Sequence, residues 1–205
     1  MKKTVICNIP MKERIDKVLY TSDDESIPVA ERKVRFPICA FLEKTMSSGD
    51  ELNVIILVKK DKYGHYENNV ELFKTELTEA IANIGTIINY CEIDTDFEQT
   101  KAVHEQLMGR IVDVLDVGSH IVVDITYGPK DLPIVIFSAL NFAEKYLDCT
   151  VDNIVYGQAS FVNGKAVDTK ICDMIPLYCL GSNTNTIRCD EPGKARSMLK
   201  ALLAL

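Results

Sequence analysis

Residues 121–133 read IVVDITYGPKDLP, and this stretch decides the fold. A run of β-branched residues predicts a buried strand that stops at the turn residues Gly128 and Pro129. An apolar helix is expected to begin straight afterwards, with Asp131 as its N-cap and Pro133 in its first turn. A strand that leads directly into a helix is typical of a parallel sheet with covering helices.

The rest of the chain repeats this alternation of short apolar runs and helical patterns. Strands are expected at 3–9, 53–58, 86–93, 120–126 and 153–157. Helices are expected at 37–47, 69–84, 98–116, 131–147 and about 193–205. Asn68 and Glu71 resemble a capping box at the start of the second helix. A hairpin around Asn163 and Gly164 is followed by a polar loop at 181–186.

Strands that alternate with helices are connected by right-handed crossovers, which make neighbouring strands parallel. The sequence therefore predicts an α/β, Rossmann-like fold with a mainly parallel sheet and helices on both faces, followed by a C-terminal hairpin and helix. The helix at 131–147 is apolar nearly all round, so both of its sides need cover. The sheet can cover one side, and a second subunit could cover the other.

Composition narrows the functional classes. The chain has 205 residues, of which 47% are hydrophobic and 26% charged, as in one soluble globular domain. The net charge of −7 argues against a general binder of duplex nucleic acid or acidic membranes. Seven scattered cysteines without a Cys-x-x-Cys pair favour buried reduced thiols in a cytoplasmic protein. The longest mostly apolar stretch, 132–143, is shorter than the roughly 20 residues that span a bilayer.

Candidate ligand-binding residues follow the strands, because open parallel sheets bind ligands beyond the carboxyl ends of their strands. In the loop after 120–126, Gly128 permits close approach or positive φ, and Lys130 adds a positive charge. The helix start offers unpaired N–H groups that favour an anion, so the pattern is typical of a phosphate site. The candidates are Asn8, Ile9, Pro10, Thr126, Tyr127, Gly128, Pro129, Lys130 and Asp131.

Several alternatives stay open at this point. The loop could equally be a capped turn without function, and Lys59 and Lys60 could be electrostatic guides or solvated charges. Neither Gly-x-Gly-x-x-Gly nor Gly-x4-Gly-Lys-Ser/Thr occurs, which argues against an NAD enzyme or a P-loop ATPase. No cofactor and no metal are expected. Structural or surface roles are expected for His65, His104 and His120, which lack spacing partners.

The segment 124–144, DITYGPKDLPIVIFSALNFAE, resembles the signature of the CARF (CRISPR-associated Rossmann fold) family. The likeness is to members that carry Asp-x-Thr-His-Gly-x-Arg or Asp-x-Thr-Gly-Gly-Thr-Lys. It runs through Asp124, Thr126, Gly128 and Lys130. The apolar helix and the later NIVYG follow in the family's order.

The resemblance covers residues 1–175, which it identifies as a CARF-like ligand-binding domain. Tyr127 stands where members often have His or Gly, and Pro129 also departs from the pattern. Family members usually continue into an effector domain. Residues 176–205 are therefore interpreted as a C-terminal loop and helix that make a dimer contact or connect to an effector.

The resemblance implies a homodimer that binds a cyclic tetra- or hexa-adenylate, the messenger of type III CRISPR antiviral signalling. In one hypothesis the chain is a sensor that controls an effector. In the alternative it is a standalone, metal-independent ring nuclease, in which the ribose 2′-OH attacks the adjacent phosphate. Lys130 would then stabilise the developing charge, and Tyr127 or Thr126 would assist proton transfer. An unrelated Rossmann-like small-molecule enzyme is a third hypothesis.

Overall fold

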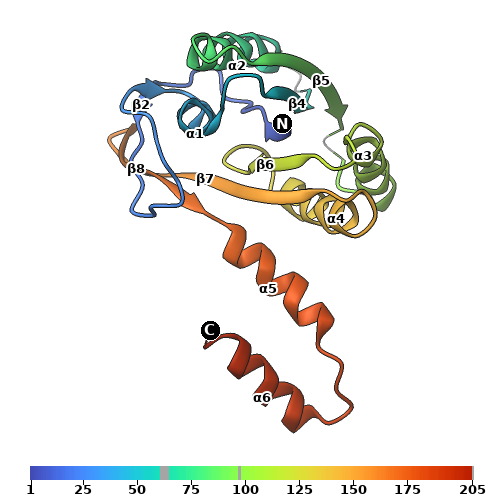
Figure 1. The fold of residues 1–205 in the computed structure, drawn as a ribbon. Helices are drawn as coiled ribbons and strands as arrows, with labels where there is room; N and C mark the ends of the chain where they lie inside the picture. Colours follow the sequence, from blue (N-terminus) through green and yellow to red (C-terminus); the bar gives the residue numbers. More distant parts are fainter. Residues whose placement is uncertain (61–64, 97, 205) are drawn as a thin grey trace. The chain divides into compact units, whose positions relative to one another are not determined.

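The computed structural model describes residues 1–60, 65–96 and 98–204 (Figure 1). The chain divides into two compact units, Met1–Asp173 and Met174–Leu205. The first unit contains the central sheet and the second contains two helices, and each is described by itself.

Within the described residues, the first unit is built on a six-stranded sheet in the order β5-β4-β1-β6-β7-β8. Its strands are β1 (Lys2–Asn8), β4 (Glu51–Lys59), β5 (Ile87–Thr95), β6 (His120–Asp124), β7 (Thr150–Val162) and β8 (Lys165–Asp173). Neighbours from β5 to β7 pair in parallel, and β8 pairs antiparallel with β7. A separate two-stranded sheet joins β2 (Val18–Leu19) and β3 (Lys33–Val34).

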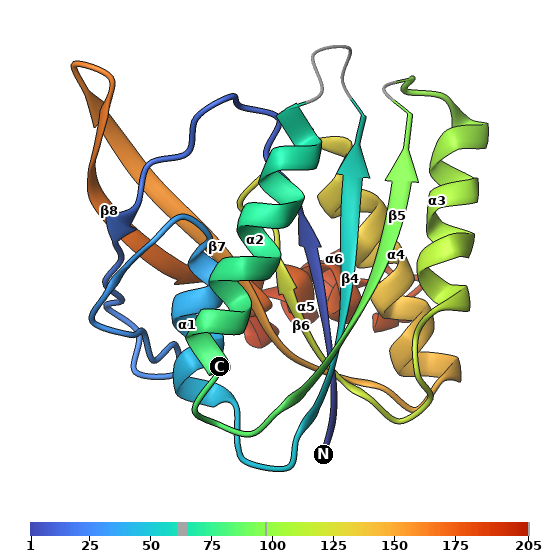
Figure 2. The same ribbon diagram turned by 90° about the horizontal axis from the view of Figure 1, so that it is seen from above.

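Helices cover both faces of the sheet. They are α1 (Pro37–Thr45), α2 (His65–Ile81), α3 (Lys101–Asp113) and α4 (Asp131–Tyr146). The first two pack together on one face and the last two on the other (Figures 1 and 2). The continuous apolar runs of β1 and β4 are buried because both of their faces are covered. The predicted α/β, Rossmann-like fold class is confirmed.

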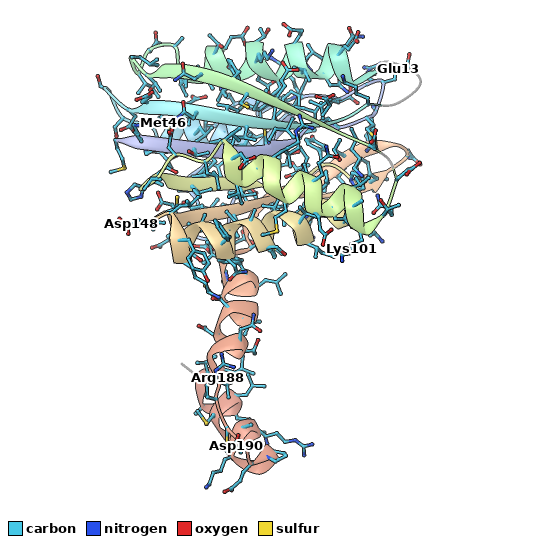
Figure 3. The ribbon with its side chains drawn as sticks, turned by 90° about the vertical axis from the view of Figure 1, so that its right-hand side faces the viewer. Glu13, Met46, Lys101, Asp148, Arg188 and Asp190 are labelled. Carbon is cyan, nitrogen blue, oxygen red and sulfur yellow. The ribbon has the colours of Figure 1, made fainter. Side chains whose placement is uncertain are left out.

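Side chains fill the space between the sheet and its two helix layers (Figure 3). Glu13, in the loop after β1, and Lys101, at the start of α3, lie at the carboxyl ends of the parallel strands. Met46 and Asp148 lie at the opposite end. The carboxyl end is the edge at which a ligand site is expected.

Two predicted helix caps are wrong. Helix α2 begins at His65 and not at residue 69, so Asn68 is inside the helix and cannot form the predicted capping box. The residues just before this helix, 61–64, lie outside the described part of the chain. At α4 the N-cap is Lys130, with helical backbone angles and no side-chain cap bond, and Asp131 is the first helical residue.

The second unit consists of α5 (Ile175–Thr186) and α6 (Pro192–Leu202). The polar loop predicted at 181–186 is wrong, because these residues form the last turns of α5. Thr184 Oγ1 donates to the carbonyl of Gly181 at 3.0 Å, so its side chain is compatible with the helical backbone. No helix in the described ranges combines the length and the hydrophobicity needed to cross a bilayer.

The predicted hairpin is confirmed, with Asn163 and Gly164 at φ +50° and +76° between β7 and β8. In β7, Gly157 permits the close approach of α1 to the sheet. A Cβ at Gly157 would lie 2.4 Å from Cγ of Pro37 and 3.1 Å from Cγ2 of Thr126. A proline ring at a helix start cannot move aside easily, so only glycine fits at this position.

We expect Gly157→Ala to lower the free energy of unfolding by about 2–3 kcal/mol, because the added methyl group overpacks the junction of α1 and β7. Gly109→Ala is the matched control, since Gly109 lies in α3 with nothing within 4 Å of an added Cβ. It should raise stability by roughly 0.5–1 kcal/mol. Urea denaturation of both variants checks this, and equal effects would contradict the close approach.

Candidate functional site

The strand order places a crevice between β1 and β6. From β1 the chain crosses to β4 and β5 on one side, whereas β6 and β7 lie on the other. The loops after β1 and β6 therefore diverge at the topological switch point, where open α/β sheets bind ligands. A cavity of about 730 Å³ lies there. Its walls are the loop after β1, the turn after β6 and the β7–β8 hairpin, whose tip lies near the β1 loop (Figure 2).

The structure brings only part of the predicted site to this cavity. Four of the candidates line it, namely Pro10, Thr126, Tyr127 and Gly128. Gly128 has φ +93°, the positive value that its position predicted. Two candidates from the end of β1 are buried, Asn8 and Ile9. Pro129 is half-buried, and Lys130 is exposed with no ion-pair partner in the described part of the chain.

The turn after β6 is anchored by the buried carboxylate of Asp124. Asp124 is 3% exposed and accepts a hydrogen bond from the backbone N–H of Thr126 at 2.8 Å. Burial raises the pKa of Asp124 to about 6, although hydrogen bonds from Thr126 and from the backbone of Ile38 oppose the rise. The Thr126 hydroxyl oxygen accepts from the Gly157 N–H at 2.7 Å. One carboxylate therefore links β6, its turn and the start of α1, and Thr126 extends the link to β7.

The Tyr127 side chain is held from the side opposite the cavity. Its hydroxyl donates to the carbonyl of Arg35 at 2.7 Å, and its ring packs edge-on against Phe36, with centroids 6.1 Å apart. Burial, with the neighbouring Tyr20 and Asp124, raises the pKa of Tyr127 well above its usual range. Burial also raises the pKa of Tyr20 to about 12. Both phenols are therefore protonated at neutral pH and present neutral ring surface to the cavity.

The loop after β1 carries the cavity's positive charge. Asn69 of α2 fixes this loop, because its buried amide donates to the carbonyls of Pro10 at 2.6 Å and Lys12 at 2.8 Å. Lys12 and Arg14 both line the cavity, and Arg14 pairs with Asp16 at 2.9 Å. These cations were missed in the sequence. The run MKERIDK directly after the first strand was the signal that could have identified them.

Aromatic rings on the hairpin were also missed. Tyr156 and Phe161 of β7 line the cavity, and 62% of Phe161 is exposed. The Lys12 ammonium lies 5.4 Å from the centroid of the Phe161 ring, which is cation–π geometry. The sequence contained a weak signal, since these aromatics stand in a strand that continues beyond the sheet into a hairpin.

Asp131 is turned away from the cavity. Its carboxylate is 3.3 Å from the Lys59 ammonium and 3.3 Å from Nε2 of His104. Burial alone would raise the pKa of Asp131, but its own backbone N–H and Lys59 outweigh this and hold it below the usual value. Lys59 is buried in this pair, so its interpretation as an outer guide or a solvated charge is wrong. Lys60 is exposed and pairs with Asp94 at 3.1 Å on the surface, as expected of a solvated charge.

Comparison with protein-family models gives no match for this chain, and comparison with curated protein sequences gives none either.

We expect the unfolding free energy of the protein to fall as pH rises from about 4 to about 6. The folded state holds the Asp124 proton more tightly than the unfolded state, so the contribution of this group to stability is greatest below the unfolded pKa and decreases up to the folded pKa of about 6. The full decrease from this group is about 3 kcal/mol. Asp124→Asn should remove it. Denaturant titrations at several pH values check this, and an unchanged slope in the variant would contradict the assignment.

Proposed function

We propose that the chain is a sensor that binds a cyclic oligoadenylate in the cavity at the carboxyl ends of β1, β6 and β7, as a homodimer that controls an effector. The observation that carries the proposal is the cavity of about 730 Å³ at the switch point, with two cations next to aromatic rings. Its volume is within the range of roughly 300–1,000 Å³ typical of small-molecule sites. A macrocycle of several nucleotides is larger than one such ligand, which favours two copies of the cavity.

The lining chemistry matches a phosphodiester with aromatic bases. Lys12 and Arg14 offer charge-assisted contacts to phosphates, and Gly128 lets a ligand approach the backbone closely. Tyr156 and Phe161 offer ring faces on which bases can stack. The net charge of −7 does not oppose this, because these cations act at short range inside the crevice.

The exposed side of α4 supports the dimer. Ile134 on this helix is 69% exposed. An apolar groove of about 320 Å³ beside it is bounded by α3, with Met108 and Val135 among its lining residues. An exposed apolar surface of this kind is typical of an interaction site.

The geometry favours binding over cleavage. In the ring-nuclease hypothesis, Tyr127 or Thr126 would assist proton transfer. The Tyr127 hydroxyl donates to a backbone carbonyl and has a raised pKa, and the Thr126 hydroxyl is engaged by Asp124 and Gly157. Neither group is positioned as a free base, so the sensor is the better supported of the two functions.

Calorimetry with cyclic tetra- and hexa-adenylate tests the proposal. We expect one ring to bind without conversion to linear adenylates, and Lys12→Ala and Arg14→Ala each to weaken binding ten-fold or more, about 1.4 kcal/mol, by removing a phosphate contact. Lys101→Ala is the matched control, since Lys101 is an exposed cation at the same end of the sheet, paired with Glu105. It should leave affinity unchanged.

Binding of neither ring would overturn the function. Unchanged affinity in one of the two variants would remove that residue from the site. EDTA-insensitive production of linear adenylates would replace the sensor by the ring nuclease.

Sedimentation velocity tests the dimer. We expect a two-fold assembly at micromolar concentration, and Ile134→Glu to shift it toward monomer, because a charge would be buried in the apolar contact. The matched control is Val117→Glu, since Val117 is 70% exposed in the loop after α3. A wild-type chain that sediments as a monomer would contradict the proposed interface.

A further inference from the structure

The side chain of Asn8 is an unpaired polar group in the core. Asn8 ends β1 and is 3% exposed. Within the described residues, neither its Nδ2 nor its Oδ1 has a hydrogen-bond partner. Another buried polar group of β1 is paired, since the Thr4 hydroxyl donates to Oγ of Ser119 at 3.2 Å. A buried amide without partners costs stability, so its presence needs an explanation.

A single glycine separates this amide from the cavity. Gly128 lines the cavity, and Asn8 does not. A Cβ at Gly128 would lie 3.0 Å from Cδ1 of Leu132 and 3.2 Å and 3.3 Å from Cβ and Cγ of Asn8, so Gly128 packs closely beside the Asn8 side chain. Gly128 has φ +93° and no side chain, which makes its backbone the least restricted part of the turn.

The turn is fixed on both sides of Gly128. Thr126 is bonded to Asp124 on one side, and on the other side Leu132 N–H bonds to the carbonyl of Pro129 at 3.2 Å in the first turn of α4. A change at Gly128 can therefore uncover Asn8 without displacing β6 or α4.

We propose that Asn8 is the base-reading residue of the site, uncovered when the turn at Gly128 moves aside for the ligand. This inference rests on the proposed function and deepens it. An asparagine amide pairs bidentately with adenine, because Oδ1 accepts from the exocyclic N6 amine while Nδ2 donates to the ring N7. Hypoxanthine presents an oxygen acceptor in place of that amine and would leave Oδ1 unpaired.

An asparagine at position 8 therefore destabilises the free protein and stabilises the complex. In the free protein the unpaired amide is a cost that an apolar side chain would remove. In the complex the amide makes two hydrogen bonds that an apolar side chain cannot make. Asn8 should thus lower stability while it raises affinity and selectivity, a trade-off that is typical of functional sites.

Thermal unfolding without ligand tests whether Asn8 lowers the stability of the free protein. We expect Asn8→Leu, which has a similar shape, to raise the Tm by about 3 °C. Asn8→Val is the second variant, smaller and suited to a strand, in case leucine is too large beside Gly128. Thr4→Val is the matched control in the same strand, and it should lower the Tm because it breaks the bond to Ser119. A lower Tm for both Asn8 variants would overturn the inference.

Binding of cyclic tetra- and hexa-adenylate, and of the cyclic inosinates of the same two sizes, to the full chain tests whether Asn8 raises affinity and selectivity for adenine. We expect wild type and Thr4→Val to prefer the adenylate ring ten-fold or more. Both Asn8 variants should lose this preference and at least ten-fold in affinity for the adenylate ring. Asn8 variants that keep the wild-type preference would overturn the role of Asn8 and leave the proposed function standing. A wild-type chain that binds none of these rings would overturn the proposed function, and with it the proposal that Asn8 recognises adenine.

Discussion

The buried carboxylate of Asp124 holds together the edge of the first unit at which the candidate site lies. It accepts hydrogen bonds from the turn that follows its own strand and from the start of α1. Thr126 carries the link on to Gly157 of β7. A charge taken out of water at this depth is tolerated only because several donors meet it. Without it, the turn, α1 and β7 would lose their common anchor, and the wall of the cavity would lose its shape.

At the same edge, the charge of the cavity lining differs in sign from the net charge of the chain. The chain carries a net charge of −7, yet Lys12 and Arg14 line the cavity. Another cation of this edge, Lys59, is already neutralised by Asp131 at the start of α4. An incoming anion therefore meets the β1 loop and the exposed Lys130, while Asp131 occupies the position in front of the helix that a phosphate could have taken.

The fold was predictable because it depends on local patterns. Apolar runs such as 53–58 need cover on both faces, and helical stripes between them supply it. The last turns of α5 were not predictable in this way, since GSNTNT has the composition of a loop. The pairing of Asp131 with Lys59 was equally hidden, because the two residues are 72 positions apart and only the packed sheet brings them together. The position of the site followed from the switch-point rule, whereas the hairpin wall did not, since it depends on how far β7 extends.

Amide hydrogen exchange with and without cyclic tetra- or hexa-adenylate locates the bound ligand, because it reports which backbone segments the ligand protects. We expect slower exchange in the three walls of the cavity, the segments 11–18, 126–128 and 156–166. Binding that protects only the opposite end of the strands, around Met46 and Asp148, would contradict it.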